Sequence, residues 1–422
     1  MASPPIPYTE AAEQVQLFIR ALAADHAQRQ HPSQPEIVPL ASAAGRVLAL
    51  PLLADRDYPP FPRSTRDGFA CRAADANTHQ FLFLAARLRA GQVPTAPLHT
   101  GELCEIMTGA PVPDGADAVF MVEHAEHSAS GQSGPDFVRL APDRTLQPGE
   151  NIVPRGSEAR AGDLLLPAGI RLHAPQIALA AQCGYHQLTV APQPRVAILT
   201  TGDEIIPVET TPGPSQIRNS NAPMLAALVA AAGAIPVILP AVPDQEAALD
   251  AVLPLALDTD LLLVSGGISA GRFDLVDDAL TRLGARFFFG GVAIQPGKPA
   301  AFGQLPRLGN PVLPFFALPG NPISSAVTFH LFAAPLLAAL SDDVTPLPRF
   351  ALATLAGTWR GKAGLTRFLP AHCDFGPAAE VRLIPWQGSG DLAAYARSNC
   401  FLVIPQESSD LSEGSVVQIL LP

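Results

Sequence analysis

Residues 261–274 read LLLVSGGISAGRFD, and this stretch decides the fold of the region around it. Leu261–Val264 is an apolar run of the length of a buried strand, and a Gly-Gly pair flanked by Ser265 and Ser269 follows it. Glycines directly after a buried strand allow a tight turn and a close approach of the backbone to a ligand. In α/β folds this loop lies at the carboxyl end of a parallel strand, and its N–H groups suit a phosphate. The stretch therefore predicts a site for an anionic small molecule, with Asp274 near its mouth.

Strand-like and helix-like patterns alternate on both sides of this stretch. Strands are expected in RVAILTTGDE (195–204) and IPVILPAVPD (235–244), and a strand, a loop and a long helix are expected in 315–340. Such alternation indicates a parallel sheet with right-handed crossover connections. We expect residues 190–341 to form a doubly wound, flavodoxin-like α/β domain.

The remaining sequence is β-like and rich in turns. Within residues 51–149, Gly and Pro recur every 8–12 residues between β-like segments at 81–86, 91–97, 117–126 and 136–141. Short β segments also fill residues 346–422, which end in SVVQILL. We predict a multidomain α+β and α/β protein. Its other parts are an inserted β-rich domain (51–149), a C-terminal β-barrel (346–422) and an elongated N-terminal linker domain (6–50 with 150–188).

Composition and charge exclude several classes of function. A net charge of −11 over 422 residues argues against nucleic-acid binding, which needs a basic face. The start, MASPPIPYTEAAEQ, has no signal-peptide pattern, and apolar runs of about ten residues predict no membrane span and no membrane partner. Five scattered cysteines without CxxC spacing fit a reducing cytoplasm rather than a zinc site.

Acidic residues follow several of the expected parallel strands. They are Asp203, Glu204, Asp244 and Asp274. Because parallel strands share one carboxyl edge, these carboxylates are expected to converge in one cleft, where they would suit Mg²⁺. Alternatively, each acid caps the helix that follows it. No GxGxxG motif follows a strand and no GxxxxGK[ST] motif is present, which disfavours a Rossmann dehydrogenase and a P-loop NTPase.

Two further motifs lie outside the expected α/β domain. PPFPRSTRDGFA occupies residues 59–70, and MTGAPVP occupies residues 107–113. Taken alone, each is explained by ordinary turn chemistry.

Six motifs in a fixed order give the chain a close resemblance to a known family. From residue 6 to the C-terminus it resembles the MoeA-type molybdopterin molybdenumtransferases, also called the gephyrin E-domain family. The motifs are PPFPRS before Asp67-Gly68-Phe69-Ala70, Met107-Thr108-Gly109-Ala110-Pro111, Thr201-Gly202-Asp203-Glu204, Ser265-Gly266-Gly267-Ile268-Ser269, Pro296-Gly297-Lys298-Pro299 and Leu318-Pro319-Gly320-Asn321-Pro322.

The resemblance implies a reaction and a set of site residues. Molybdate is inserted into adenylylated molybdopterin with Mg²⁺-assisted release of AMP, in a homodimer whose active cleft both protomers share. A molybdopterin adenylyltransferase and apo-molybdoenzymes are implied as partners. The implied catalytic residues are Asp67, Thr108, Glu204, Asp244 and Asp274, of which Glu204, Asp244 and Asp274 would also hold the metal. The implied binding residues are Ser265, Gly266, Gly267, Ser269, Asp203, Lys298, Pro319, Pro322 and Ser389.

Several positions depart from the family pattern. Arg66 stands where methionine is common, Gly291 and Gln295 where lysines are common, and Asp277 where a basic residue is common. Fewer positive charges are expected to weaken oxyanion binding, because each charge-assisted contact contributes about 1.5–3 kcal/mol. Either Arg66 and Arg272 compensate, or the affinity for molybdate is low. Arg367 and Lys362 are candidates for further contacts.

Three other functions compete with molybdate insertion. A molybdopterin adenylyltransferase would be a compact single domain, so the length of this chain disfavours it. A non-catalytic molybdopterin carrier or scaffold is disfavoured by the retained acidic residues. Tungstate could replace molybdate, because the two oxyanions have nearly the same size and charge.

Overall fold

The protein divides into two compact units in a computed structural model. The structure describes residues 4–28, 34–128, 136–266, 275–307, 312–345 and 347–422. The first unit comprises Met1–Ala49, Gly169–His173 and Gln187–Pro422, and the second comprises Leu50–Ala168 and Ala174–His186. The four domain boundaries expected from the sequence stay a prediction.

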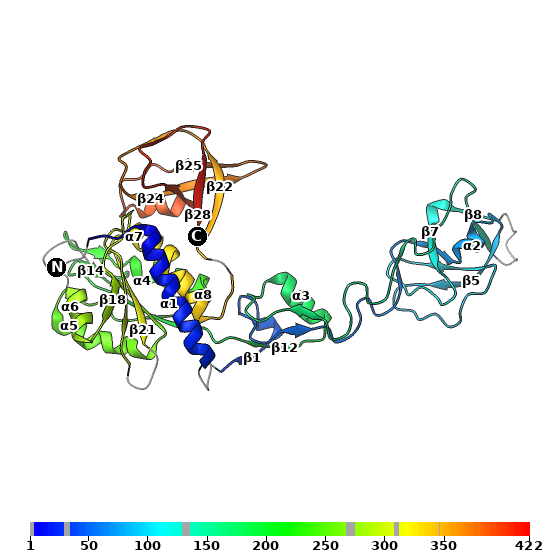
Figure 1. The fold of residues 1–422 in the computed structure, drawn as a ribbon, viewed down its shortest axis with the longest axis horizontal. Helices are drawn as coiled ribbons and strands as arrows, with labels where there is room; N and C mark the ends of the chain where they lie inside the picture. Colours follow the sequence, from blue (N-terminus) through cyan, green and yellow to red (C-terminus); the bar gives the residue numbers. More distant parts are fainter. Residues whose placement is uncertain (1–3, 29–33, 129–135, 267–274, 308–311, 346) are drawn as a thin grey trace. The chain divides into compact units, whose positions relative to one another are not determined.

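A six-stranded sheet forms the centre of the first unit (Figure 1). Its strand order is β16 (Ile235–Ile238), β13 (Arg195–Thr200), β17 (Leu261–Ser265), β21 (Leu313–Leu318), β20 (Ala301–Leu305) and β18 (Arg286–Phe289). The first four strands are parallel, whereas β20 and β18 add an antiparallel edge. The expected parallel α/β sheet is therefore confirmed, with an antiparallel extension.

Helices cover both faces of this sheet. Alternate residues of β13 face different cores, with Val196 and Ile198 in one and Ala197 and Leu199 in the other. On the first face lie α1 (Tyr8–Gln28), α4 (Asn221–Ala231), α7 (Pro322–Thr328) and α8 (Ala334–Leu340). On the other lie α5 (Glu246–Val252) and α6 (Leu275–Arg282), which are neighbours in Figure 1. Strands that are buried on both faces read as continuous apolar runs, which is why the sequence revealed them.

A π-helical turn joins α7 to α8. This turn, η4 (Phe329–Ala333), precedes Pro335. Because proline has no N–H to donate to the helical hydrogen-bond ladder, the helix adopts a π-helical turn beside it. The helical segment Pro322–Leu340 is long and apolar enough to cross a membrane, but 89% of its window is buried inside the protein. It therefore serves as the core helix of the α/β layer.

A closed five-stranded barrel follows the α/β layer. Its strands pair in a ring in the order β24 (Thr366–Phe375), β25 (Ala379–Leu383), β22 (Arg349–Leu355), β28 (Val416–Leu421) and β26 (Cys400–Ile404), which returns to β24. A short strand from the α/β layer, β19 (Ile294–Gln295), pairs with β24 in parallel. Phe368, Phe401 and Leu420 of the barrel pack into the α/β core. The expected C-terminal β-barrel is confirmed.

The second unit is built on another six-stranded sheet. Its order is β7 (Ala118–Met121), β4 (Gly68–Cys71), β6 (Glu102–Ile106), β5 (Leu82–Leu88), β9 (Phe137–Leu140) and β8 (Ala125–His127). The β-rich prediction is confirmed for this region, but residues 91–97 form no strand. Pro94 and Pro97 lack the N–H groups that a ladder needs.

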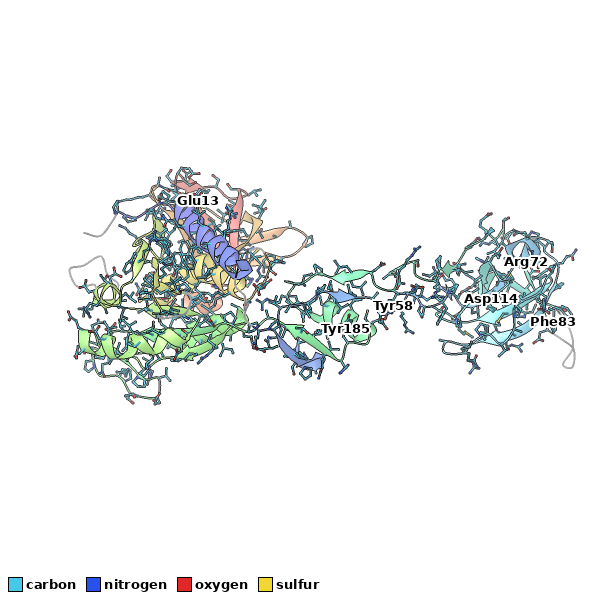
Figure 2. All side chains as sticks on the ribbon, turned by 60° about the horizontal axis from the view of Figure 1, so that its bottom comes forward. Glu13, Tyr58, Arg72, Phe83, Asp114 and Tyr185 are labelled. Carbon is cyan, nitrogen blue, oxygen red and sulfur yellow. The ribbon has the colours of Figure 1, made fainter. Side chains whose placement is uncertain are left out.

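Two tyrosines tie α3 (Ala174–Gln182) and the residues after it to earlier parts of the second unit (Figure 2). The Tyr58 hydroxyl lies 2.8 Å from the Gln182 carbonyl oxygen, and the Tyr185 hydroxyl lies 3.2 Å from that of Leu53.

Shorter elements complete the two units. Short helices are α2 (Ala73–Ala76) and α9 (Leu392–Arg397). Two-stranded pairs are β1 (Glu36–Pro39) with β12 (Gln187–Val190), β2 (Leu52–Leu53) with β11 (Leu164–Leu166), β3 (Arg63–Ser64) with β10 (Ile152–Val153), β14 (Ile205–Ile206) with β15 (Ile217–Arg218), and β23 (Trp359–Arg360) with β27 (Asp410–Leu411).

Candidate functional site

A cleft of about 720 Å³ opens at the carboxyl ends of the parallel strands. We call it the carboxylate cleft, because Glu204 and Asp244 are among its lining residues. Loops after β13, β16, β17 and β21 contribute to its walls; they supply Thr201, Gly202, Glu204, Asp244, Ser265, Gly266, Gly320, Asn321 and Pro322. The structure thus brings five predicted site residues together: Glu204, Asp244, Ser265, Gly266 and Pro322. Their shared edge follows from the parallel strand order.

Asp244 is a carboxylate of this cleft whose pKa is shifted. Burial raises its pKa above the usual range, and the negative charges of Asp203 and Glu204 add to the rise. The Thr201 hydroxyl nearby opposes the rise, although it does not reach the geometry of a hydrogen bond. The Asp244 N–H donates to Asp203 Oδ1 at 3.1 Å, whereas the buried Oδ1 of Asp244 has no hydrogen-bond partner among the described residues. A buried carboxylate oxygen with neighbouring negative charges favours a cation or a proton there.

Gly266 is required by the protein's own backbone. Its φ is +103°, and a Cβ at this position would lie 2.2 Å from the Thr201 carbonyl oxygen. The sequence had suggested that glycine serves the approach of a ligand. The structure adds a closer reason, which is that the loop passes directly against the loop after β13.

Ser265 is buried and bonded within the protein. Its side chain is 2% exposed and accepts a hydrogen bond from Asn221 Nδ2 at 2.8 Å, while Ser325 Oγ lies 3.2 Å away. The same Asn221 amide donates to the Gly320 carbonyl oxygen at 2.6 Å. These contacts join the start of α4 to the loops after β17 and β21, and so they hold the cleft walls.

The sequence alone does not decide whether Asn221 caps a helix or contacts a ligand. The structure separates two neighbouring asparagines: Asn219 Oδ1 accepts from the Ala222 N–H at 3.1 Å near the helix start, whereas Asn221 ties the start of α4 to the end of β17 and to the loop after β21. Only the residue type could have signalled this, since asparagine offers both donors and an acceptor.

Part of the predicted site lies outside the described residues. Gly267, Ser269, Arg272 and Asp274 all belong to residues 267–274, which the structure does not describe. In the part of the chain that the structure describes, no group of three or more His, Cys, Asp or Glu side chains is arranged to hold a metal. The metal set of Glu204, Asp244 and Asp274 therefore stays a prediction.

A second cleft of about 760 Å³ adjoins the first, and Gly320 and Asn321 line both. We call it the lysine cleft, because Lys298 is the charged residue among those that line it. Pro319 and Ser389, both predicted binding residues, line it as well. Ser389 Oγ accepts from Asn321 Nδ2 at 2.9 Å, which ties a barrel loop to the turn between the clefts. Among the described residues no Asp or Glu lines this cleft, whereas the carboxylate cleft is lined by Glu204 and Asp244 together with one cation, Arg218.

In the second unit, Asp67 and Thr108 form a pair. Asp67 Oδ1 accepts from the Thr108 N–H at 2.7 Å and from its hydroxyl at 2.9 Å. These two hydrogen bonds lower the pKa of the exposed Asp67 carboxyl. The pairing of β4 with β6 brings Asp67 and Thr108 together, although they are 41 positions apart. The glycine after Asp67 is also needed, because a Cβ at Gly68 would lie 1.9 Å from the Phe120 carbonyl oxygen.

Family models match nearly all of the chain. They are the MoeA N-terminal region, domains I and II (residues 6–184), a probable molybdopterin binding domain (197–339) and the MoeA C-terminal region, domain IV (353–421). The chain belongs to the MoeA family of molybdopterin molybdenumtransferases. It is thus an enzyme of molybdenum cofactor biosynthesis, as the resemblance had implied.

Relatives of this family cover the chain from end to end. A molybdopterin molybdenumtransferase of Bacillus subtilis (strain 168) is 34% identical over 428 residues, covering 99% of this chain and 94% of the relative. One from Haemophilus influenzae is 31% identical over 398 residues, covering 93% and 95%. The crystal structure of the molybdopterin biosynthesis moeA protein from Pyrococcus horikoshii OT3 superimposes with a TM-score of 0.79 at 27% identity, covering 99% and 100%.

Proposed function

We propose that this MoeA-family enzyme inserts molybdate into adenylylated molybdopterin, with Mg²⁺-dependent release of AMP. The observation that carries the proposal is the pair of adjoining clefts, one lined by Glu204 and Asp244 and the other by Lys298, which meet at Gly320–Asn321. An enzyme that transfers molybdenum from an oxyanion to the dithiolene of an adenylylated substrate needs a binding place for each of the two, side by side.

The proposed reaction balances without an oxidant or a reductant. The two dithiolene sulfurs bind molybdenum, and one molybdate oxygen leaves as water with two protons. Water breaks the phosphoanhydride bond between molybdopterin and AMP, and its oxygen remains on phosphorus. We assign the adenylylated substrate to the carboxylate cleft and molybdate to the lysine cleft, where Lys298 is free of any ion pair formed by described residues.

The residues of the carboxylate cleft fit a magnesium ion. Asp244 offers a buried oxygen that no described residue binds, and Glu204 lines the same cleft. Mg²⁺ in proteins is commonly held by one or two carboxylates together with substrate phosphates and water. In this proposal Glu204 and Asp244, with Asp274, hold the ion, which would neutralise phosphate charge when bound.

Asp67 and Thr108 are proposed to act in the same reaction, in a homodimer with a shared cleft. The lowered pKa keeps the Asp67 carboxyl ionised at neutral pH, as a charged contact requires. A cytoplasmic location, a molybdopterin adenylyltransferase as supplier and apo-molybdoenzymes as acceptors complete the proposal. Sedimentation of the purified chain tests the dimer.

The decisive experiment mixes the purified protein with adenylyl-molybdopterin, Mg²⁺ and molybdate, and follows AMP release. Molybdate-dependent release, with transfer of active cofactor to an apo-molybdoenzyme, is expected. Tight binding of the adenylate without AMP release, even with tungstate, would identify a molybdopterin carrier or scaffold instead. Faster release with tungstate than with molybdate would identify a tungstate-preferring transferase.

A further inference from the structure

Arg367 carries a buried charge that the described part of the protein does not neutralise. Its side chain is only 8% exposed, and its guanidinium lies 5.4 Å from the centre of the Trp359 ring. Its Nε donates to Gln295 Oε1 at 2.9 Å, and its Nη1 donates to the Leu365 carbonyl oxygen at 3.2 Å. No ion pair among the described residues includes it. Because buried charges are normally paired, this cation calls for an anion that the described residues do not supply.

The place of Arg367 indicates which anion that would be. Both of its hydrogen-bond partners, Gln295 and Leu365, line the lysine cleft. The parallel pairing of β19 with β24 puts Gln295 and Arg367 in register, so the contact is built into the fold. Lys298 therefore lines the cleft, and Arg367 adds a second positive charge one hydrogen bond behind its wall, where none of the described carboxylates lines it.

Gln295 is oriented by this contact. Arginine has no acceptor, so the amide oxygen of Gln295 must face Arg367 and its NH₂ group must point away. No described residue accepts a hydrogen bond from that NH₂ group. A glutamate in the same place would hold Arg367 equally well, but it would cancel the positive charge.

We propose that Gln295 is a positioning and specificity-determining residue for the oxyanion. Its carbonyl oxygen holds Arg367 beside the lysine cleft without neutralising it, and its NH₂ group is left to donate to an oxyanion. Two positive charges and a neutral donor match a tetrahedral dianion of the molybdate type. The inference deepens the proposed function and rests on its assignment of the oxyanion to this cleft.

The test is the substitution Gln295→Glu, measured by equilibrium dialysis of the purified full chain against molybdate and by its melting temperature. We expect molybdate to bind about tenfold more weakly or worse, because one positive charge is cancelled. The melting temperature should be unchanged or higher, because the new carboxylate pairs with Arg367. A purely structural role for Gln295 would leave molybdate binding as it is, and that result would overturn the inference.

Two further variants separate the effect of added charge from the effect of losing the Gln295 amide. Gln418→Glu, at an exposed position of β28, adds the same charge elsewhere in the first unit and should change neither measurement. Gln295→Met keeps the length of the side chain but removes its donors and acceptor. The affinity of this variant for molybdate should therefore fall between those of the wild type and Gln295→Glu. Equal affinities of Gln295→Met, Gln295→Glu and the wild type for molybdate would also overturn the inference. A wild-type protein that binds neither molybdate nor tungstate would instead overturn the proposed oxyanion site itself.

Discussion

The carboxylate cleft and the lysine cleft share one turn yet differ in their charged residues. Glu204 and Asp244 line the first, with Arg218, whereas Lys298 is the charged side chain among the described residues of the second, with Arg367 bonded to its wall. In a chain of net charge −11, an oxyanion needs such a local reversal of sign to bind. The difference indicates that a short turn, Gly320–Asn321, is enough to separate two binding places of different chemistry.

Removing one charge from the carboxylate cleft should have the largest effect. Asp244→Asn should lower the rate of AMP release about a hundredfold or more, because a preorganised charge at the reacting centre is lost. Molybdate binding by dialysis should stay unchanged if the two clefts act separately. Asp143→Asn, at an exposed site of the second unit, serves as the control. A parallel loss of molybdate binding would contradict the separation.

A side chain at Gly266 should strain the backbone that forms part of the wall of the carboxylate cleft. Gly266→Ala is expected to lower the free energy of unfolding by about 1–3 kcal/mol or more, through backbone strain and contact with Thr201. Gly414 also has a positive φ, +81°, but a Cβ there meets nothing within 4 Å, so Gly414→Ala measures the strain alone. Denaturant unfolding of both variants separates the two effects. Equal losses would show that the Thr201 contact costs nothing.

Removing the lysine should weaken the other cleft alone. Lys298→Met is expected to weaken molybdate binding about tenfold, the effect of one charge-assisted contact, because Arg367 remains. Binding of AMP, measured by calorimetry, should not change. If AMP binding falls as much as molybdate binding, the clefts do not divide the substrates in the proposed way.

The smallest effect concerns Asp67, which belongs to neither cleft. Thr108→Val removes the hydroxyl hydrogen bond but keeps the N–H bond, so the pKa of Asp67 should rise part of the way toward its ordinary value of 3.8. Because the folded pKa is lowered, the contact stabilises the fold fully above pH 3.8, and this contribution is lost as the pH falls through the lowered pKa. Carboxyl NMR titration of wild type and variant measures the change. An unchanged pKa would assign the whole effect to the backbone N–H.

Much of the carboxylate cleft could be predicted from local sequence. Apolar runs such as Leu261–Val264 mark strands buried on both faces, and the alternation with helices implies parallel order. Parallel order alone then requires the residues after each strand, Glu204 and Asp244 among them, to share one edge. The C-terminal barrel was predicted from another local signal, the short β segments that fill residues 346–422.

The lysine cleft could not be predicted in this way. In the sequence, Gln295 was interpreted only as the loss of a positive charge. Its partner Arg367 is 72 positions away, on a strand of the barrel.

The sequence by itself determined the classes of element, their order and the family, because these depend on local periodicity and on short motifs. Only the tertiary structure decided which partner each polar side chain meets. Asn221 joins α4 to β17 and to the loop after β21, Gly266 leaves room for the Thr201 carbonyl oxygen, and Gln295 holds Arg367. The physical reason is that hydrogen bonds act over about 3 Å. Strand register and domain packing, which no local pattern encodes, bring distant residues within that range.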